Sequence, residues 1–469
     1  MKLFGAGKPD HPMADLKEAR RILDALPAQE MKALEELANW HESVSAAKGF
    51  KAEELAQRVA MIDEAAQPRL RKLAREYLGA GRVQQNLLWT RIHEYWYQAG
   101  QAYARVIEAR PLPEVVVGGL RALAQQLKWE QLRYGPIDPG LWGLINRIFA
   151  TAEAKGIAAA NPEFLKAALF GASAMDSRLP TDIELAERVI DALAPAFVLA
   201  KAPAPALPYW TDLDRPMSPA RSIQPLQSAA SLRFIGPGGA LARLQSLMKG
   251  VEKSGQAPAE LKLGAACDTD ALLVVLRHLA AHWGPTPPER RHKRHSMTSR
   301  LKIAHGFDGV VQALGGGGDS LDFGAGENGI WTVENISAGG FGALAPQAKS
   351  DWLKVGALVA AWPEGAPGWM VGTVRRVSKL SPQAIRVGVQ TLSRTPAVSQ
   401  FALRNTGAPG VLLPAAPGET AIALRAGVYA RGENLEATIH GRQLVYLPQG
   451  IAERGDDYEI VKFREMVRE

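Results

Sequence analysis

The sequence predicts a multidomain α+β protein, in which an N-terminal all-α helical bundle precedes an antiparallel β-barrel and a small C-terminal β unit. Two observations predict this class. From about residue 14 to residue 200, strong helix formers dominate and apolar residues recur at helical spacing. From Arg300 onward, apolar residues recur at every second position and β-branched residues become frequent. A length of 469 residues suits two to four domains.

Composition limits the functional classes. A hydrophobic content of 47% is ample for several cores, and a net charge of +7 with a pI near 9.3 suits an anionic ligand or partner. No apolar run approaches the roughly 20 residues that a membrane helix needs, and the first residues lack the apolar segment of a signal peptide. The single cysteine, Cys267, excludes an internal disulfide framework. We therefore expect a cytoplasmic protein with no membrane insertion.

The stretch from Gln84 to Ala109 shows the clearest helical period. Trp89, Trp96 and Tyr97 widen its apolar face, as in a helix that is buried on more than one narrow stripe. We expect this face to lie in the core of the bundle, and a surface for a second copy or a partner is the alternative. The positions that define the face recur at spacings of three and four: Leu88, Ile92, Tyr95, Ala99, Tyr103 and Val106.

Changes in composition suggest domain boundaries. Five prolines lie between Lys201 and Ala220, and such a run forms a semi-rigid linker or an extended strap on another surface. Tyr209 and Trp210 favour the strap, because a free linker has little use for two aromatic residues. The expected divisions are a helical bundle over 1–200, a Pro-rich linker over 201–220, a short helical segment over 221–284, the barrel over 285–400 and a β-rich extension over 401–469.

Short strands with turn signals between them fill the C-terminal third of the chain. Six strands within about a hundred residues are typical of a closed or nearly closed barrel: Leu301–Ile303, Gly309–Ala313, Ile330–Asn335, Ala357–Trp362, Trp369–Val377 and Ile385–Thr391. The strands expected in the extension are Val411–Leu413, Thr420–Leu424, Gly427–Tyr429, Leu435–Ile439 and Gln443–Leu447. The last stretch, Tyr458 to Val467, fits a strand or a helix.

Two motifs flank the start of the barrel. The basic run from Arg290 to His295 contains R-x-x-x-R, and a strand-like segment further on ends in N-x-S-x-x-G, from Asn335 to Gly340. In this order, with β-rich sequence after them, the two motifs resemble the ligand signature of PilZ domains, the small bacterial β-barrels that bind cyclic di-GMP. The resemblance covers about residues 289–394. The Gly-rich insertion from Gly315 to Gly329 departs from the family pattern, although the motif residues are intact.

The resemblance implies a ligand, cyclic di-GMP, and the residues that hold it, with no catalytic residue, metal or cofactor. A further basic contact on a later strand is common in the family, and Arg375 or Arg376 fits that role. An arginine fork matches the N7 and O6 acceptors of guanine or a phosphate, and Asn and Ser supply short directional partners. The motif residues implied to bind ligand are Arg290, Arg291, Arg294, Asn335, Ser337, Gly339 and Gly340.

The same resemblance implies a receptor rather than an enzyme. Ligand that bridges the arginine segment and the barrel would order the linker and rearrange the helical region, which would then act on a protein partner. The alternative is a nucleic-acid-binding or scaffold protein whose PilZ-like barrel does not bind the dinucleotide, but no basic stripe with interleaved aromatic residues supports nucleic acid. The sequence leaves open the process controlled, the oligomeric state and whether one or two dinucleotides bind.

Other candidate motifs have simpler interpretations. The stretch Gly324 to Gly329 matches G-x-G-x-x-G, but no adequate helix follows it. His278 and His282 share a helix without the glutamate of a zinc-protease motif, so we interpret them as core or surface residues. Cys267 has no base nearby in the sequence, so we expect a small buried residue.

Overall fold

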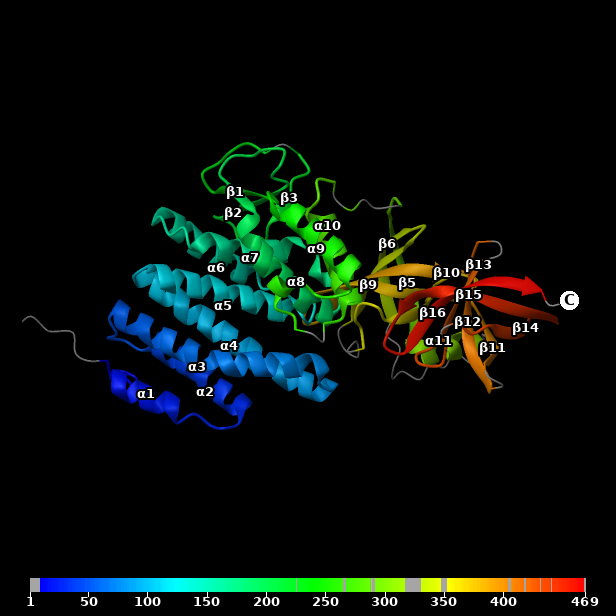
Figure 1. The fold of residues 1–469 in the computed structure, drawn as a ribbon, viewed down its shortest axis with the longest axis horizontal. Coiled ribbons are helices and arrows are strands. Elements are labelled where there is room, and N and C mark those ends of the chain that lie inside the picture. The colour runs from blue at the N-terminus through cyan, green and yellow to red at the C-terminus, as the bar shows by residue number, and fades with distance from the viewer. Residues whose placement is uncertain are drawn as a thin grey trace, which may run out of the picture. The chain divides into compact units, whose positions relative to one another are not determined.

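The structure is a computed structural model that describes residues 9–224, 226–264, 267–286, 288, 292–316, 330–346, 352–403, 406–416, 419–430, 432–439 and 441–467. The chain divides into two compact units. The first consists of Met1–Arg133, Ile137–Met175 and Pro180–Pro288, and the second consists of Tyr134–Pro136, Asp176–Leu179 and Glu289–Glu469. In Figure 1 the helices of the first unit run from blue to green, and the strands of the second run from yellow-green to red.

Helices form most of the first unit. The predicted apolar face of the fourth helix is buried in the core, whereas Tyr97 is 40% exposed, so its predicted place on that face is wrong. Asp268 caps the last helix, because its Oδ1 accepts from the backbone N–H groups of Asp270 and Ala271 at 3.0 and 3.1 Å. The helices are α1 (Leu16–Asp24), α2 (Glu30–Ala46), α3 (Ala52–Gly79), α4 (Arg82–Ala109), α5 (Pro113–Gln131), α6 (Pro139–Ala154), α7 (Ala160–Ala172), α8 (Pro180–Leu193), α9 (Ala240–Ser254) and α10 (Thr269–Trp283).

The Pro-rich stretch 201–220 is a strap inside the first unit rather than a linker between domains. It carries β2 (Tyr209–Asp212), which pairs with β4 (Leu232–Gly236) in a small antiparallel sheet. Tyr209 is buried, and its hydroxyl donates to the carbonyl of His282 at 2.5 Å. The short strands β1 (Val198–Ala200) and β3 (Ala220–Arg221) complete the sheet, in the order β1-β4-β2-β3. Burial of the aromatic side chain explains why this proline run is not a free linker.

The second unit begins with the predicted antiparallel barrel, closed in the order β10-β7-β6-β5-β8-β9. Residues 309–313, predicted as a strand, lie in the helix α11 (Gly306–Gly315), because Phe307, Val310 and Ala313 fall at helical spacing and are buried together. Sequence reasoning missed β7, whose Gly and Ala content has low β propensity. The strands are β5 (His295–His305), β6 (Ile330–Ser337), β7 (Gly340–Pro346), β8 (Leu358–Pro363), β9 (Met370–Ser381) and β10 (Ala384–Ser393).

The predicted C-terminal β unit is a second closed barrel, in the order β11-β12-β13-β16-β15-β14. Tyr458 to Val467 is a strand, whereas Gly427–Tyr429 lies outside the strands, in and after a turn in which Gly427 has a φ of +75°. Side chains of both barrels and of α11 share one buried cluster. The strands are β11 (Ala397–Leu403), β12 (Thr406–Ala416), β13 (Glu419–Arg425), β14 (Leu435–Ile439), β15 (Arg442–Arg454) and β16 (Tyr458–Val467).

A tyrosine that lies between α5 and α6 in the sequence completes the core of the first barrel. Tyr134 is 8% exposed and packs in the same cluster as Leu353 and Val355. Its carbonyl accepts from the backbone N–H of Lys379 at 2.8 Å, and its hydroxyl accepts from that of Val355 at 3.4 Å. The second unit is therefore assembled from segments that are distant in the sequence.

Candidate functional site

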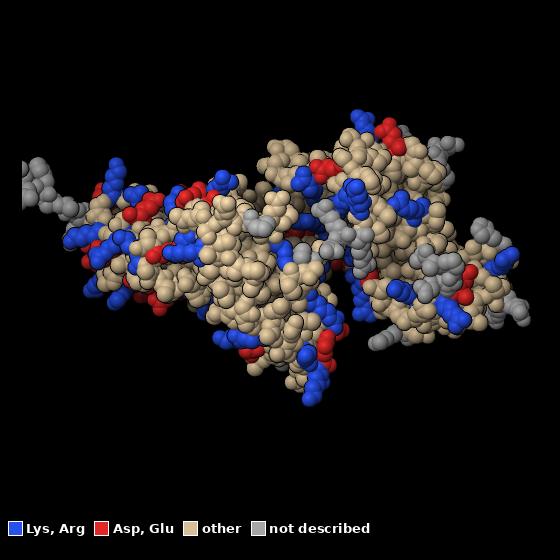
Figure 2. Space-filling view, turned by 90° about the horizontal axis from the view of Figure 1, so that it is seen from above, with Lys and Arg blue, Asp and Glu red and all other residues tan. Residues whose placement is uncertain are grey.

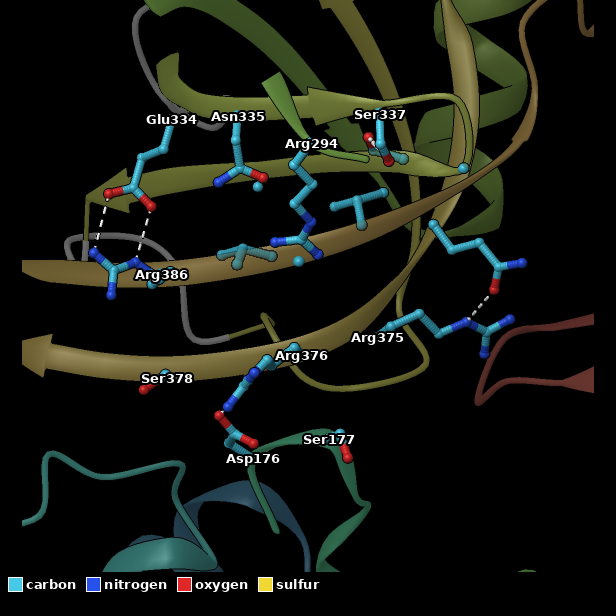
Figure 3. A pocket seen from close by; sticks show the side chains of 17 residues that line it. Asp176, Ser177, Arg294, Glu334, Asn335, Ser337, Arg375, Arg376, Ser378 and Arg386 are labelled. Atoms are coloured by element: carbon cyan, nitrogen blue, oxygen red, sulfur yellow. Dashed lines mark hydrogen bonds and ion pairs between the residues drawn. The ribbon is translucent and has the colours of Figure 1, made fainter. Parts of the chain in front are cut away.

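A cavity of about 780 Å³ lies on the outer face of the first barrel. This volume is in the range of small-molecule sites in proteins, roughly 300–1,000 Å³. Its walls come from β6, β7, β9 and β10, from the residue before β5 and from the segment 176–177 of the same unit (Figure 3). The lining residues are Asp176, Ser177, Arg294, Glu334, Asn335, Ser337, Gly339, Gly340, Gly342, Arg375, Arg376, Ser378, Arg386, Val387, Gly388, Val389 and Gln390.

Strand pairing brings the two predicted motifs together. β5 runs antiparallel to β6 and pairs Ser296 with Asn335. Arg294 immediately precedes β5, so it reaches the cavity beside the N-x-S-x-x-G turn. Figure 3 shows its side chain between those of Asn335 and Ser337. The predicted residues Arg290 and Arg291 lie outside the residues that the structure describes.

Hydrogen bonds and a close strand contact hold the turn of the second motif. The Ser337 hydroxyl donates to the Gly340 carbonyl at 3.1 Å. Arg394, which follows β10, donates to the carbonyls of Ser337 and Ala338 at 3.3 and 3.4 Å. A Cβ atom at Gly340 would lie 2.0 Å from the Val389 carbonyl oxygen, and the Gly340 φ is +153°. Only glycine fits there, because a side chain would overlap the backbone of β10.

Asn335 has a buried side-chain oxygen and lines the cavity. Its Oδ1 is buried and has no partner among the described residues. The amide lies against Gly342, where a Cβ atom would come within 2.8 Å of Nδ2. Gly342 pairs with Gly388 across β7 and β10, so the floor beside Asn335 is bare backbone. Of the buried side-chain atoms without a partner among the described residues, the Oδ1 atoms of Asn335 and Asp176 belong to residues that line this cavity.

A β-bulge turns two adjacent arginines toward the same side of β9. Gly388 pairs with Arg376 and Val389 pairs with Val374, which leaves Arg375 as the extra residue. Both arginines are exposed, whereas alternation in a regular strand would bury one of them. The bulge therefore places two cations at one wall of the cavity.

The two bulge arginines have different partners. Arg375 donates to Gln390 at 2.8 Å and forms a bidentate pair with Glu453 of the second barrel, at 2.9 and 2.5 Å. Arg376 donates from Nε to Asp176 at 2.5 Å (Figure 3). The Asp176 Oδ1 atom is buried and has no partner among the described residues. Asp176 thus pairs with one of the cations in the cavity wall.

Arg386 and Glu334 form an ion pair at another wall of the cavity. The arginine donates to the two carboxylate oxygens at 2.8 and 3.1 Å, and this hydrogen bonding raises the pKa of Arg386. Four arginines and two carboxylates line the cavity. This excess of cations favours an anionic ligand.

All predicted site residues that the structure describes line this one cavity: Arg294, Asn335, Ser337, Gly339, Gly340, Arg375 and Arg376. A Cβ atom at Gly339 would lie 2.9 Å from the ring of His292, so this glycine lets the basic segment approach the turn. Sequence reasoning missed Asp176, Glu334 and Arg386. For Arg386, the alternation of Arg386, Gly388 and Gln390 on an otherwise apolar strand was the available signal.

The remaining sequence motifs have structural partners or lie outside the described residues. His278 hydrogen-bonds through Nε2 to the Ser173 carbonyl at 2.7 Å, and its ring contacts that of His282. Cys267 is half-buried, and burial raises the pKa of its thiol. The G-x-G-x-x-G stretch 324–329 lies outside the described part. Within that part, no cluster of three or more His, Cys, Asp or Glu residues could hold a metal ion, and no helix is both long and apolar enough to cross a bilayer.

The helical region of this chain matches a described protein family. Residues 17–204 match the family described as the N-terminal domain of the cyclic-di-GMP receptor FimW. This match lies outside the two motifs of the barrel, and it confirms the predicted resemblance to cyclic di-GMP receptors. A solved structure that matches is the PlzA protein of Borreliella burgdorferi in complex with c-di-GMP, with 5% identity over 37% of this chain and 87% of that chain and a TM-score of 0.15. A likeness at that score supports no conclusion by itself, and no curated protein matches this chain.

Proposed function

We propose that this protein is a bacterial cytoplasmic receptor for cyclic di-GMP, and that its first barrel is a PilZ domain that binds the dinucleotide in the cavity described above. One observation carries the proposal: strand pairing sets Arg294 beside Asn335 and Ser337, next to a buried acceptor that has no partner among the described residues. The family match over residues 17–204 supports the same ligand from a separate part of the chain.

Each residue then has a role that its chemistry allows. Arg294 offers a planar fork to a guanine N7 and O6 edge or to a phosphate. The open Oδ1 of Asn335 accepts from a guanine N–H group. Gly342 and Gly388 let the side chains of Asn335 and Arg376 lie close against the strands, because a Cβ atom at either glycine would come within 2.8 or 3.3 Å of them. Arg290 and Arg291 complete the cationic segment, as the family pattern implies.

Ligand binding would compete with a carboxylate already in the site. A phosphate near Arg376 would displace Asp176, which pairs with that arginine at 2.5 Å. Asp176 is continuous in sequence with the helix α8, so its displacement is a route by which binding could alter the helical region. The helical region would then act on a protein partner.

Calorimetric titration of the full-length protein with cyclic di-GMP tests the proposal. We expect micromolar or tighter binding for the wild-type protein. Each arginine fork contributes on the order of 1.5–3 kcal/mol, so Arg294→Ala should weaken binding roughly ten- to a hundredfold. The Arg290→Ala/Arg294→Ala double variant should bind more weakly still.

Arg20→Ala provides the matched control, because Arg20 is an exposed arginine on α1 in the other unit. It should bind like the wild-type protein. Equal affinity of Arg294→Ala and the control would remove the cavity as the site. No binding by the wild-type protein would leave the barrel as a scaffold.

A further inference from the structure

The first unit carries a second hollow, of about 570 Å³, among α3, α4, α5 and α8. Its floor is apolar. Ile92, Trp96 and Trp129 are at most 5% exposed, and Ala74 and Leu78 at the α3 side are half-buried. Burial of apolar surface drives association, so an open groove with such a floor can bind an apolar face of another molecule.

Arginines form the rim of this groove. Arg71 and Arg75 lie one turn apart on α3, and Arg121 and Arg188 come from α5 and α8. All four are exposed at the surface. Arg71 has no ion pair among the described residues, and the Nε of Arg75 donates to the backbone carbonyl of Arg71 at 3.2 Å. The α3 rim therefore presents two guanidinium groups with no carboxylate partner in the described part of the chain.

The acidic residues of the groove are held by a buried lysine. Lys128 is only 6% exposed and binds Glu184 at 2.5 Å and also Glu187, which accepts from Gln125 as well. Burial lowers the pKa of Lys128, but the two carboxylates outweigh this and raise it. Glu184 also pairs with Arg188 at 3.3 Å, so these two cations balance the two carboxylates, and Arg121 pairs with Asp63. The cationic charge without a carboxylate partner among the described residues is that of Arg71 and Arg75.

We propose that this groove binds an acidic amphipathic helix of a protein partner. The apolar part of the groove would receive the apolar face of that helix, and Arg71 and Arg75 would pair with its flanking Asp or Glu residues. A small phosphate ligand fits less well, because the cation within the groove is already paired with two carboxylates. A nucleic acid fits less well, because two arginines one turn apart form no extended cationic track for a phosphate backbone.

Selection from a displayed library of helix-forming peptides, using the full-length protein, tests this proposal. Enriched peptides should combine apolar residues at spacings of three and four with acidic residues beside them. An enriched peptide, synthesised and labelled, should bind the Arg71→Glu/Arg75→Glu variant at least about tenfold more weakly, because like charges would then face one another. A peptide with its acidic residues changed to Lys should recover binding to that variant.

The Lys249→Glu/Lys253→Glu variant is the matched control, since these lysines are exposed one turn apart on α9 in the same unit. It should bind the enriched peptide like the wild-type protein. Enriched peptides without acidic residues, or equal loss in the control, would overturn the proposal. Salt-dependent self-association that disappears in the Arg71→Glu/Arg75→Glu variant would instead identify a second copy of the chain as the occupant.

The selection and the binding measurements need no cyclic di-GMP, and the groove and the barrel cavity lie in different units. Failure of the peptide experiment would therefore leave the ligand proposal intact, and absence of ligand binding would leave this one intact.

Discussion

Each unit contains a group of buried polar residues, and the two groups differ in how completely their hydrogen bonds are made. In the first unit, the Asp63 carboxylate accepts from Gln67, Tyr95, Tyr103 and Arg121 at 2.8, 3.1, 3.0 and 3.0 Å. In the first barrel, the Oδ1 atom of Asn335 is also buried but has no partner among the described residues.

Under the proposed function, we expect this difference to separate a structural group from a binding group. A carboxylate with four donors has no capacity left for a ligand, and it stabilises the helices that supply those donors. An amide oxygen without a donor contributes nothing to the fold and becomes useful only when a ligand supplies the N–H group. On the face shown in Figure 2, Lys and Arg lie among Asp and Glu and form no continuous stripe over the described residues.

The largest expected effect comes from removing the Asp63 carboxylate, which accepts hydrogen bonds from four side chains. Asp63→Ala would leave two tyrosine hydroxyls and one guanidinium without their acceptor, so we expect α3 to α5 to lose about 3 kcal/mol or more of stability. Asn335→Ala should change the stability of the first barrel by less than about 1 kcal/mol. Native-state hydrogen exchange on α4 and β6 measures both losses. Similar losses of stability in Asp63→Ala and Asn335→Ala would contradict the distinction between a structural and a binding group.

A buried histidine beside the Asp63 group predicts acid sensitivity in the first unit. His41 contacts the Tyr95 hydroxyl at 3.2 Å, and burial lowers the His41 pKa from 6.5 to about 4, against the opposing effect of Asp63. The unfolded chain takes up a proton below pH 6.5 and the folded chain only near pH 4, so stability is complete above pH 6.5 and falls between these values. Between pH 7 and pH 4.5 we expect a loss of about 2.4 kcal/mol. Helical circular dichroism in urea at pH 7 and pH 4.5 measures it.

The His41→Phe variant is the control, because it lacks the titrating group. Its stability should change less between pH 7 and pH 4.5 than that of the wild-type protein. An equal pH dependence in both proteins would show that His41 is not the source.

The turn that lines the barrel cavity requires glycine at position 340. A side chain at Gly340 would overlap the Val389 carbonyl, so Gly340→Ala should destabilise β7 by about 2–3 kcal/mol and abolish ligand binding. Gly450 on β15 of the second barrel has a similar φ of +143°, but a Cβ atom added there would meet no atom within 4 Å. Gly450→Ala should therefore cost less, about 1 kcal/mol. Hydrogen exchange on β7 and β15 measures the stability lost in Gly340→Ala and Gly450→Ala. Equal losses would show that the contact with the Val389 carbonyl is not the cause.

The smallest expected effect concerns Asp176, whose carboxylate lines the barrel cavity. Asp176→Asn should strengthen cyclic di-GMP binding up to about fivefold, since an exposed ion pair contributes up to about 1 kcal/mol and its loss frees Arg376. Asp308→Asn removes another Arg–Asp pair of the same unit, with Arg425, and should leave affinity unchanged. Calorimetry of both variants checks this. Unchanged affinity in Asp176→Asn would mean that the ligand does not compete for Arg376.

Much of the fold followed from local patterns. The period of three and four predicted the buried face of α4, and alternation predicted most strands of the first barrel. The errors arose where the local signal was weak or ambiguous. Residues 309–313 have β-branched residues but are helical, because one face of α11 fills the core shared by the two barrels. The Gly and Ala residues of β7 carry no strong propensity, and pairing with β6 and β10 holds them extended.

The sequence by itself determined the two classes of structure, the two motifs and the chemistry that suits an anionic dinucleotide. Only the tertiary structure decided that Asp176, Glu334 and Arg386 share the cavity with Arg294, that a bulge turns Arg375 and Arg376 to the same side, and that one amide oxygen is left open. The physical reason is that periodicity and capping act within a few residues. Register, bulges and the completeness of hydrogen bonds depend on which distant segments meet.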